Sequence, residues 1–416
     1  MLPERLAQAV IPAPVLAVLQ GLDARNHHAY LVGGCVRDLL RGTAPKDWDV
    51  ATSATPAEVQ ACFPKVLPTG IEHGTVTVMS RGTPVEVTTF RVEGAYVDGR
   101  RPQSVSFRTD VVEDLSRRDF TINAMAFSPT RAELVDPFQG QEDLQRKWVR
   151  AVGDPLARFS EDGLRALRAV RFATVLDFSM DPATWDAIPS TMEVFRKVSI
   201  ERVREEFQKI LMSPRAPHGI RDLRETGLLA AFLPAVAEGA DFANARVALA
   251  FAPPVLEVRL AALLLATAAD VRSLVLALRF PNRTADLAGL LAAEARGGIP
   301  ECPDGPSLRR LLARLKPENV EPFCMLLACR AGVTGGFEAS AAFVARLRAE
   351  AAANPPLDAR ALALNGGAIM QALGVGPSPA VGQATRYLLE RVLDEPSLNT
   401  AEQLTSLLRT WSAAAR

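Results

Sequence analysis

Two aspartates near the start of the chain have the spacing of a site for divalent cations. Asp47 and Asp49 flank Trp48 where a loop enters a predicted strand. Residues two apart in a strand point to the same face, so the two carboxylates project together. Two such charges are costly unless a cation neutralises them, and Mg²⁺ uses carboxylate oxygens as ligands. Glu86, in a second predicted strand, is a candidate third carboxylate; an outward-facing surface glutamate is the equal alternative.

A glycine pair lies between a predicted strand and a predicted helix just before these aspartates. Residues 29–32 form the strand, which runs into Gly33 and Gly34 ahead of a helix over about 36–41. Glycines let a backbone pass close to a ligand, and the free N–H groups at a helix N-terminus bind phosphate. Arg37 adds a guanidinium suited to a two-pronged phosphate contact. Taken alone, such a glycine pair is more often just a tight turn.

A third polar group is the segment RRDFTINA at 117–124. Arg118 is a candidate for holding phosphate, and Asp119 and Asn123 are candidates for holding ribose hydroxyls. The alternative is a surface charge pair ahead of a strand.

Four polar residues recur at every third position in a segment predicted to be one helix over 160–176: Asp162, Arg165, Arg168 and Arg171. Helix positions three apart are neighbours, so the four predict a polar stripe. Cytosine and adenine present a donor beside an acceptor, whereas uracil and guanine present the reverse. A carboxylate only accepts and a guanidinium only donates, so Asp162 with Arg165 would pair with C or A. The alternative is an ion pair on a solvated helix, worth ~0.2–0.5 kcal/mol.

The elements that position these residues change in kind near residue 150. Before it, short strands alternate with turns; 75–79 and 85–90 predict a hairpin, and a capping box at Thr55 predicts a helix start. After it, strand signals fade and Ala-, Leu- and Arg-rich helices dominate. The predicted fold class is α+β, with a mixed or antiparallel sheet in a head followed by an all-α remainder.

Composition sets outer bounds. The 416 residues suggest two to four domains, and 47 basic against 47 acidic residues exclude a wholesale basic protein but not a local basic groove. Five cysteines with no CxxC argue against a disulfide framework and for a reducing compartment. No signal peptide is recognised, and the longest apolar stretch, near 260–269, is too short to span a bilayer. A cytoplasmic protein without membrane contact is therefore expected.

Four motifs in this order resemble a known family. They read GGCVRD at 33–38, DWD at 47–49, RRDFTINA at 117–124 and EDGLR at 161–165. The series resembles the class II tRNA nucleotidyltransferases, the bacterial CCA-adding enzymes. These belong to the polymerase-β-like superfamily and share a family with bacterial poly(A) polymerases. The resemblance covers about residues 28–230.

The resemblance implies a role for each candidate residue. Asp47 and Asp49 would be Mg²⁺ ligands, Gly33, Gly34, Arg37 and Arg118 nucleotide contacts, Asp119 and Asn123 ribose contacts, Asp162 and Arg165 the base readers, and Arg168 and Arg171 further nucleotide contacts. It also implies a nucleotidyltransferase head at 1–150, a neck at 151–220, and an RNA-binding body at 221–350 and tail at 351–416. Residues 90–93, Tyr96, Asp98 and 100–102 resemble the family's flexible loop, and 199–206 resembles a motif that braces the base-reading helix.

The implied reaction is addition of CMP and AMP from CTP and ATP to the 3′ end of tRNA, with Mg²⁺ as cofactor and pyrophosphate released. Three alternatives stay open: an A-adding enzyme with a CC-adding partner, a bacterial poly(A) polymerase, and a non-catalytic tRNA- or nucleotide-binding protein. The helices after 220 are expected to hold the acceptor stem. Candidate basic positions are Arg215, Arg221, Arg224, Arg309, Arg310, Arg314 and Lys316, each more simply explained as a solvated helix face. The oligomeric state stays open.

Overall fold

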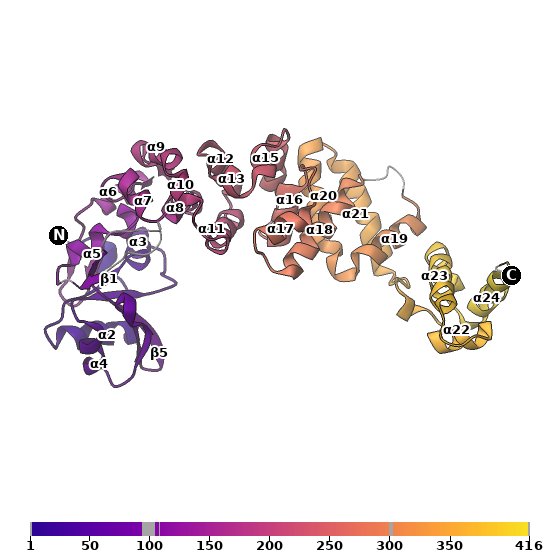
Figure 1. Ribbon diagram of the computed structural model, residues 1–416, viewed down its shortest axis with the longest axis horizontal. Helices are drawn as coiled ribbons and strands as arrows, with labels where there is room; N and C mark the ends of the chain where they lie inside the picture. Colours follow the sequence, from indigo (N-terminus) through magenta and orange to yellow (C-terminus); the bar gives the residue numbers. More distant parts are fainter. Residues whose placement is uncertain (1, 94–104, 108, 299–302, 415–416) are drawn as a thin grey trace. The chain divides into compact units, whose positions relative to one another are not determined.

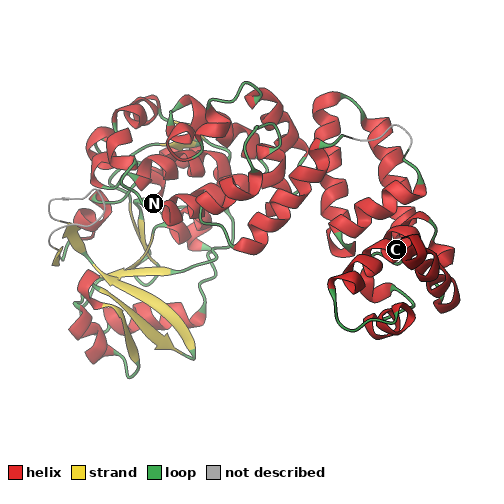
Figure 2. Ribbon diagram, turned by 45° about the vertical axis from the view of Figure 1, so that its right-hand side comes forward, coloured by secondary structure: helices red, strands yellow, loops and turns green. Residues whose placement is uncertain are grey.

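The computed structural model describes residues 2–93, 105–107, 109–298 and 303–414. They form two compact units, Met1–Phe232 and Leu233–Arg416. Every described strand lies in the first unit, and the described part of the second is helical (Figures 1 and 2). The predicted α+β class, with an all-α remainder, is confirmed. The finer division into head, neck, body and tail stays a prediction. Across the described ranges, no helix has both the length and the apolarity that crossing a membrane requires.

A mixed seven-stranded sheet organises the first unit (Figure 2). Its order is β3-β4-β5-β2-β1-β8-β9. The strands are β1 (Ala29–Val32), β2 (Asp49–Thr52), β3 (Val66–Gly70), β4 (Thr75–Ser80), β5 (Thr83–Thr89), β8 (Ala126–Ser128) and β9 (Glu133–Val135). Neighbouring strands run antiparallel except β2 and β5, which are parallel. The hairpin predicted around residues 81–83 is confirmed as β4 and β5.

Both faces of the sheet are covered, because alternate strand residues are apolar on each side. One face packs Val50, Val85 and Val87 against α2 (Ala13–Asp23) and α4 (Pro56–Cys62). The other packs residues such as Ala51 against α5 (Val111–Ser116). Asp49 and Ala51 are two apart in β2, so Asp49, the first residue of the strand, lies on this second face.

Local capping signals define the helices next to the site. The capping box at Thr55 is confirmed: its hydroxyl accepts from the Glu58 N–H, and the Glu58 carboxylate accepts from the Thr55 N–H. Helix α3 (Gly34–Arg41) starts two residues before the predicted bound and ends at Gly42, whose φ of 76° is left-handed. A glycine adopts that conformation without steric cost.

A separate two-stranded ribbon, β6 (Arg91–Glu93) and β7 (Val105–Phe107), pairs antiparallel beside α5. Of the segment predicted as a flexible loop, 91–93 form strand β6, and Tyr96, Asp98 and 100–102 lie outside the described residues.

The prediction of one helix over 160–176 is wrong. The structure has α7 (Pro155–Glu161) and α8 (Leu164–Leu176), separated by Asp162 and Gly163. A Cβ on Gly163 would lie 2.7 Å from backbone atoms of Val194 and Phe195, so the break is where another segment approaches closely. Asp162 is extended, and its carboxylate accepts from the Leu164 N–H at 3.0 Å to start α8.

The other elements are mostly helices. In the first unit they are α1 (Glu4–Ala7), α6 (Gly140–Arg146), α9 (Pro182–Ser190), α10 (Met192–Phe195), α11 (Ile200–Met212), α12 (Ala216–Glu225) and α13 (Leu228–Phe232), with strands β10 (Trp148–Val149) and β11 (Ser179–Met180). In the second they are α14 (Pro234–Ala237), α15 (Phe242–Phe251), α16 (Leu256–Leu264), α17 (Val271–Ala277), α18 (Asn282–Arg296), α19 (Gly305–Leu315), α20 (Val320–Thr334), α21 (Phe337–Ala352), α22 (Gly366–Leu373), α23 (Pro379–Asp394) and α24 (Ala401–Ala414). Short 3₁₀ turns occupy Ile71–His73, Thr121–Asn123, Pro317–Asn319, Ala359–Ala361 and Pro396–Leu398.

Three of the candidate basic positions, all in the second unit, join its helices, and their role in RNA contact stays a prediction. Arg309 is buried and donates to the Leu393 and Asp394 carbonyls at the end of α23. Arg310 pairs with Glu390 and Asp394, and Arg314 pairs with Glu294. These ion pairs engage the charge that a phosphate would use.

Replacing Gly163 with alanine tests the close approach at the helix break. The added Cβ would meet backbone atoms that cannot swing aside, so Gly163→Ala should lower the free energy of unfolding by about 1–3 kcal/mol. The control is Gly382→Ala, in α23, where the new methyl group meets nothing within 4 Å. That variant should be neutral or stabilising by up to about 1 kcal/mol. Urea titrations of both variants measure the difference, and equal behaviour would contradict the explanation.

Candidate nucleotide-binding site

The candidate metal ligands meet where β2 and β5 run parallel. The register places Asp49 directly across from Glu86, so both side chains lie on one face of the sheet. Together with Asp47 they line a cavity of about 620 Å³. Burial raises the pKa of Asp49, Arg118 opposes the rise, and the Asp47 charge adds to it. Burial and the Asp49 charge also raise the pKa of Glu86.

These carboxylates repel one another, which is the electrostatic condition of a cation site. In the part of the chain that the structure describes, however, no three His, Cys, Asp or Glu side chains are close enough together to hold a metal. The role of Glu86 as a third ligand therefore stays a prediction, as do the roles of Asp47 and Asp49.

Gly33 makes room for a guanidinium beside Asp49. Its φ is 74°, and a Cβ there would lie 3.0 Å from Arg118 Nη1 and 4.0 Å from Asp49 Oδ2. A side chain at this position would be strained and would also displace Arg118. Gly34 then begins α3, and its Cβ position lies 3.6 Å from Arg37 Nη2. The first turn of α3 and the two guanidiniums thus lie at the same end of the helix.

Asp114 holds the arginine pair and is a residue that the sequence reasoning missed. Its side chain is 1% exposed and accepts from Arg117 at 2.8 Å and Arg118 at 3.1 Å. Burial raises the pKa of Asp114, but the charges of Arg118 and Arg117 outweigh burial and bring this pKa below its ordinary value. The i,i+3 and i,i+4 spacing from Asp114 is the signal that could have found it. Arg118 Nε is buried and has no hydrogen-bond partner among the described residues.

Asp119 connects this arginine pair to α8. Its Oδ2 accepts from Arg168 Nε at 2.8 Å, and its Oδ1 accepts from the Asn123 amide at 3.2 Å. Asn123 Oδ1 in turn accepts from Arg37 Nη1 at 2.7 Å, and Arg37 also pairs with Asp38. The predicted ribose contacts are therefore brought together with two of the predicted nucleotide contacts in one network.

Asp162 and Arg165, the predicted base readers, are each held by other residues. The Asp162 carboxylate accepts from Arg202 of α11 at 2.7 Å. Arg165 is buried, pairs with Glu161, and donates to the Arg117 carbonyl at 3.0 Å. The alternative of an Asp162–Arg165 ion pair is absent from the contacts of the described side chains. Sequence reasoning missed Arg202 and Glu161 as partners, although it expected 199–206 to lie against this helix.

Three of the arginines contact one aromatic ring, that of Phe172. The guanidinium carbon of Arg171 lies 3.4 Å from the Phe172 ring centroid, and those of Arg37 and Arg168 lie 5.4 Å from it. Such contacts favour a cation over the face of the ring. Glu206 of α11 accepts from Arg171 Nε at 2.7 Å. Burial lowers the pKa of Arg171, and the Glu206 charge opposes this. Phe172 was not a sequence candidate because nothing local distinguishes it from a core residue.

Two family models match segments of this chain. Residues 29–150 match the family model of the poly A polymerase head domain. Residues 177–239 match a model described as the probable RNA and SrmB-binding site of polymerase A. A curated relative from Geobacillus thermodenitrificans, the CCA-adding enzyme, is 38% identical over 399 residues, covering 94% of this chain and 95% of the relative. The chain belongs to the CCA-adding enzyme family.

Other members of the CCA-adding enzyme family give the same result. The enzyme from Limosilactobacillus reuteri is 47% identical over 215 residues, and this match spans about half of its length, 53%. The crystal structure of the Bacillus stearothermophilus CCA-adding enzyme in complex with CTP has a TM-score of 0.81 and 32% identity, covering 97% of this chain and 99% of that one. The resemblance drawn from the four motifs is confirmed. The role of each individual residue stays a prediction.

Asp119 yields a prediction about stability and pH. Although burial raises it, the Arg168 charge and hydrogen bonds from Arg168 and Asn123 lower the pKa of Asp119 to about 2. A lowered folded-state pKa means that the stabilisation is complete above the unfolded value of 3.8 and is lost as pH falls through about 2. Asp119→Asn should therefore cost about 3 kcal/mol at pH 7, with the difference from wild type shrinking below pH 4.

Urea unfolding at pH 7, 5 and 3 measures this difference. The control is Glu193→Gln, which removes an exposed ion pair with Arg196 and should change stability by less than about 0.5 kcal/mol. A loss of the same small size in Asp119→Asn at pH 7 would contradict the structural role of this carboxylate.

Proposed function

We propose that this chain adds CMP and AMP from CTP and ATP to the 3′ end of tRNA, without a template and with release of pyrophosphate. One observation carries the proposal: the paired carboxylates Asp49 and Glu86 lie close to the arginines around the start of α3. It occurs in a chain that is 38% identical, over 94% of its length, to a CCA-adding enzyme. Acidic residues beside fixed guanidiniums are the chemistry that a metal-bound triphosphate requires.

Mg²⁺ is the cofactor we propose, with Asp47 and Asp49 as its ligands and Glu86 as the candidate third. The fit rests on the register that places Asp49 across from Glu86 and on the cavity that both share with Asp47; burial, with the neighbouring carboxylate charge, also raises the pKa of Asp49 and of Glu86. The oxygen-only donor set suits a hard cation. When bound, Mg²⁺ supplies charge neutralisation at the triphosphate and activation of the attacking hydroxyl.

The arginines bind and orient the triphosphate. Arg118 lies with its Nη1 beside Gly33 and near Asp49, where it can donate to a phosphate oxygen held at the carboxylates. Arg37 is aligned by Asp38 and Asn123 at the first turn of α3, where backbone N–H groups also favour an anion. Fixed partners hold both guanidiniums before the ligand arrives, which lowers the entropic cost of binding.

The side chains proposed for base selection are also held by fixed partners before a ligand binds. Arg202 fixes the Asp162 carboxylate, and the Glu161 carboxylate with the Arg117 carbonyl fixes Arg165. A held acceptor next to a held donor suits the Watson–Crick edge of C or A and opposes that of U or G. A ribose hydroxyl that reaches Asp119 would share an oxygen that already accepts a hydrogen bond, so Arg168 and Asn123 must adjust with it.

The cytoplasm is the compartment we propose for this reaction. Its support is that the described cysteines, Cys35, Cys62, Cys324 and Cys329, are all free thiols. Free thiols fit a reducing environment.

The decisive experiment uses tRNA that lacks its 3′ CCA, incubated with CTP, with ATP and with both, followed by sizing of the products. Addition of CC with CTP alone and of CCA with both is expected. Extension only of tRNA that already ends in CC would indicate an A-adding enzyme. Long A tracts on unrelated RNA would indicate a poly(A) polymerase, and binding without any product would indicate a non-catalytic protein.

Removal of one carboxylate tests the metal site in the same assay. Asp49→Ala should reduce the rate roughly 1,000-fold, because several kcal/mol of transition-state stabilisation are lost. The exposed carboxylate variant Glu193→Ala is the control and should retain the wild-type rate. Full activity of Asp49→Ala would rule out the proposed ligand role.

Arg165→Lys tests base reading separately from triphosphate binding. Lysine keeps the charge but loses the planar fork that reaches the Arg117 carbonyl and a base edge together. The ratio of kcat/KM for CTP to that for UTP should fall about tenfold, since one directed base contact is worth ~1–3 kcal/mol. The affinity for pyrophosphate should change less than twofold, and an equal loss of both quantities would contradict the assignment.

A further inference from the structure

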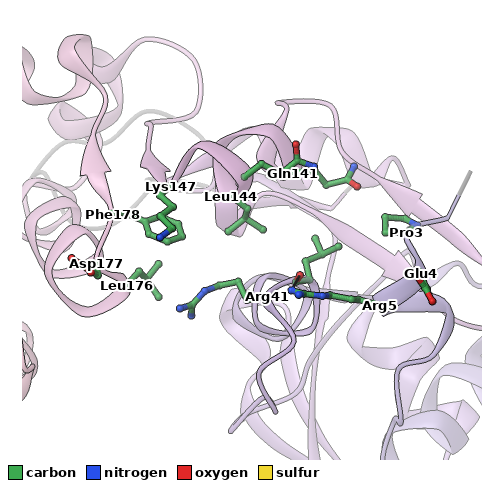
Figure 3. A pocket seen from close by; sticks show the side chains of 12 residues that line it. Pro3, Glu4, Arg5, Arg41, Gln141, Leu144, Lys147, Leu176, Asp177 and Phe178 are labelled. Carbon is green, nitrogen blue, oxygen red and sulfur yellow. Dashed lines mark hydrogen bonds between the residues drawn. The ribbon is translucent and has the colours of Figure 1, made fainter.

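Two adjoining cavities lie at the ends of α3 and α8 that face away from the nucleotide site. The larger, about 630 Å³, is lined by the last residues of both helices, Arg41 and Leu176, and by Lys147 after α6 (Figure 3). The smaller, about 300 Å³, is lined by residues of α8, α9 and α12. Asp177 and Phe178 line both cavities, so the two meet at these residues. We call the pair the back groove.

The back groove carries an excess of positive charge. Arg5, Arg41 and Lys147 line the larger cavity, and Arg215, His218 and Arg221 line the smaller. Its acidic residues are Glu4, Asp177 and Asp222. Asp177 already pairs with Arg215 at 2.9 Å, and Asp222 already pairs with Arg221 at 2.7 Å. Glu4 accepts a hydrogen bond from Gln8 at 2.9 Å.

Two of these cations have unused hydrogen-bonding capacity. Among the described residues, the Lys147 side chain makes no ion pair, and the nearest carboxylate of Arg41 is Asp38 at the long distance of 3.8 Å. The contrast with Arg310, Arg314 and Arg348 is clear, because each of those donates to a carboxylate at 2.7–3.0 Å. An anion would therefore gain contacts with Arg41 and Lys147. Arg310, Arg314 and Arg348 already make such contacts within the chain.

Apolar and aromatic surface lies directly beside these charges. The Arg41 guanidinium carbon is 5.7 Å from the centroid of the Phe178 ring. Figure 3 shows Arg41 extending toward Leu176 and Phe178, with Leu144 on the neighbouring wall. Trp185 adds a second aromatic ring in the smaller cavity. Cations that alternate with aromatic and apolar surface are the composition that holds a nucleic-acid strand, with phosphates on the charges and a base on the ring.

We propose that the back groove is an RNA-docking site, which holds phosphates of the tRNA substrate on Arg41 and Lys147 and one base against Phe178. The inference rests on the proposed function for the identity of the RNA. A free nucleotide would fill one cavity only, whereas the groove continues past Asp177 and Phe178 into a second cavity that has its own aromatic ring, that of Trp185. The second cavity also lies mostly within residues 177–239, the segment that matches the RNA-binding model. The site is separate from the catalytic residues, since it lies at the opposite end of α3 from Gly33.

The test measures the salt dependence of binding to tRNA that lacks its 3′ CCA. The full chain is compared with Arg41→Gln, Lys147→Asn and the double variant; asparagine is chosen because Lys147 has a φ of 56°, which asparagine tolerates. Each lost phosphate contact should reduce the slope of log affinity against log salt by about 1, so the double variant should lose about 2. Its dissociation constant at 0.1 M salt should rise roughly tenfold, while KM for CTP and kcat at saturating tRNA stay within twofold of wild type.

Lys65→Gln is the matched control, because Lys65 is exposed in the same unit and lines neither cavity. It should leave the slope unchanged. An unchanged slope in the double variant, or an equal change in the control, would overturn the proposal. So would loss of a second equivalent of bound CTP with no effect on tRNA, which would make a free nucleotide the occupant. If the wild-type chain binds tRNA through these residues but extends no RNA, the docking site stands and the proposed function fails.

Discussion

Mutual repulsion among five guanidinium groups is the constraint on which the nucleotide site depends. Each group is paired inside the chain: Arg37 with Asp38, Arg118 with Asp114, Arg165 with Glu161, Arg168 with Asp119 and Arg171 with Glu206. Several of these carboxylates are nearly inaccessible, and a Coulomb interaction there is stronger than at the surface. Without these carboxylates, the arginines would move apart into solvent. The binding of a triphosphate would then include the free-energy cost of bringing the guanidinium groups together.

The pairs also cross between elements, so they fix the backbone as well as the charges. Asp119 precedes the 3₁₀ turn at Thr121–Asn123 and binds Arg168 of α8, whereas Arg202 and Glu206 of α11 bind Asp162 and Arg171. Helix α8, which carries the proposed base reader Arg165, is therefore held on two sides by ionic contacts. This arrangement shows how a chain with zero net charge can gather several arginines in one place: each of the five has a carboxylate partner nearby.

The local parts of this arrangement were predictable from the sequence, and the long-range parts were not. The hairpin, the capping box at Thr55 and the glycine-led start of α3 follow from spacing within a few residues. The strand β3 carries Pro68 and is largely exposed, so it lacks the alternating apolar pattern. The break at Gly163 lies where Val194 and Phe195, some thirty residues away in the chain, approach closely. The partners of Asp162 and Arg165, Arg202 and the Arg117 carbonyl, are also distant in the chain. Motif spacing identified the candidate residues; burial and distant carboxylates decide their hydrogen bonds.

Helices α3 and α8 connect the two proposed binding regions because each helix has one end in each region. Gly33 and Arg37 at the start of α3 lie by Arg118, and Arg41 at its end lines the back groove. Along α8, Arg165 and Arg168 are candidate nucleotide contacts, and Leu176 lines the groove. A helix of 13 residues spans about 20 Å, so an anion at one end acts weakly on charges at the other through solvent at physiological salt. Any influence of docked RNA on nucleotide selection must then pass through the positions of these two helices, which the ion pairs of Asp119, Arg202 and Glu206 restrict.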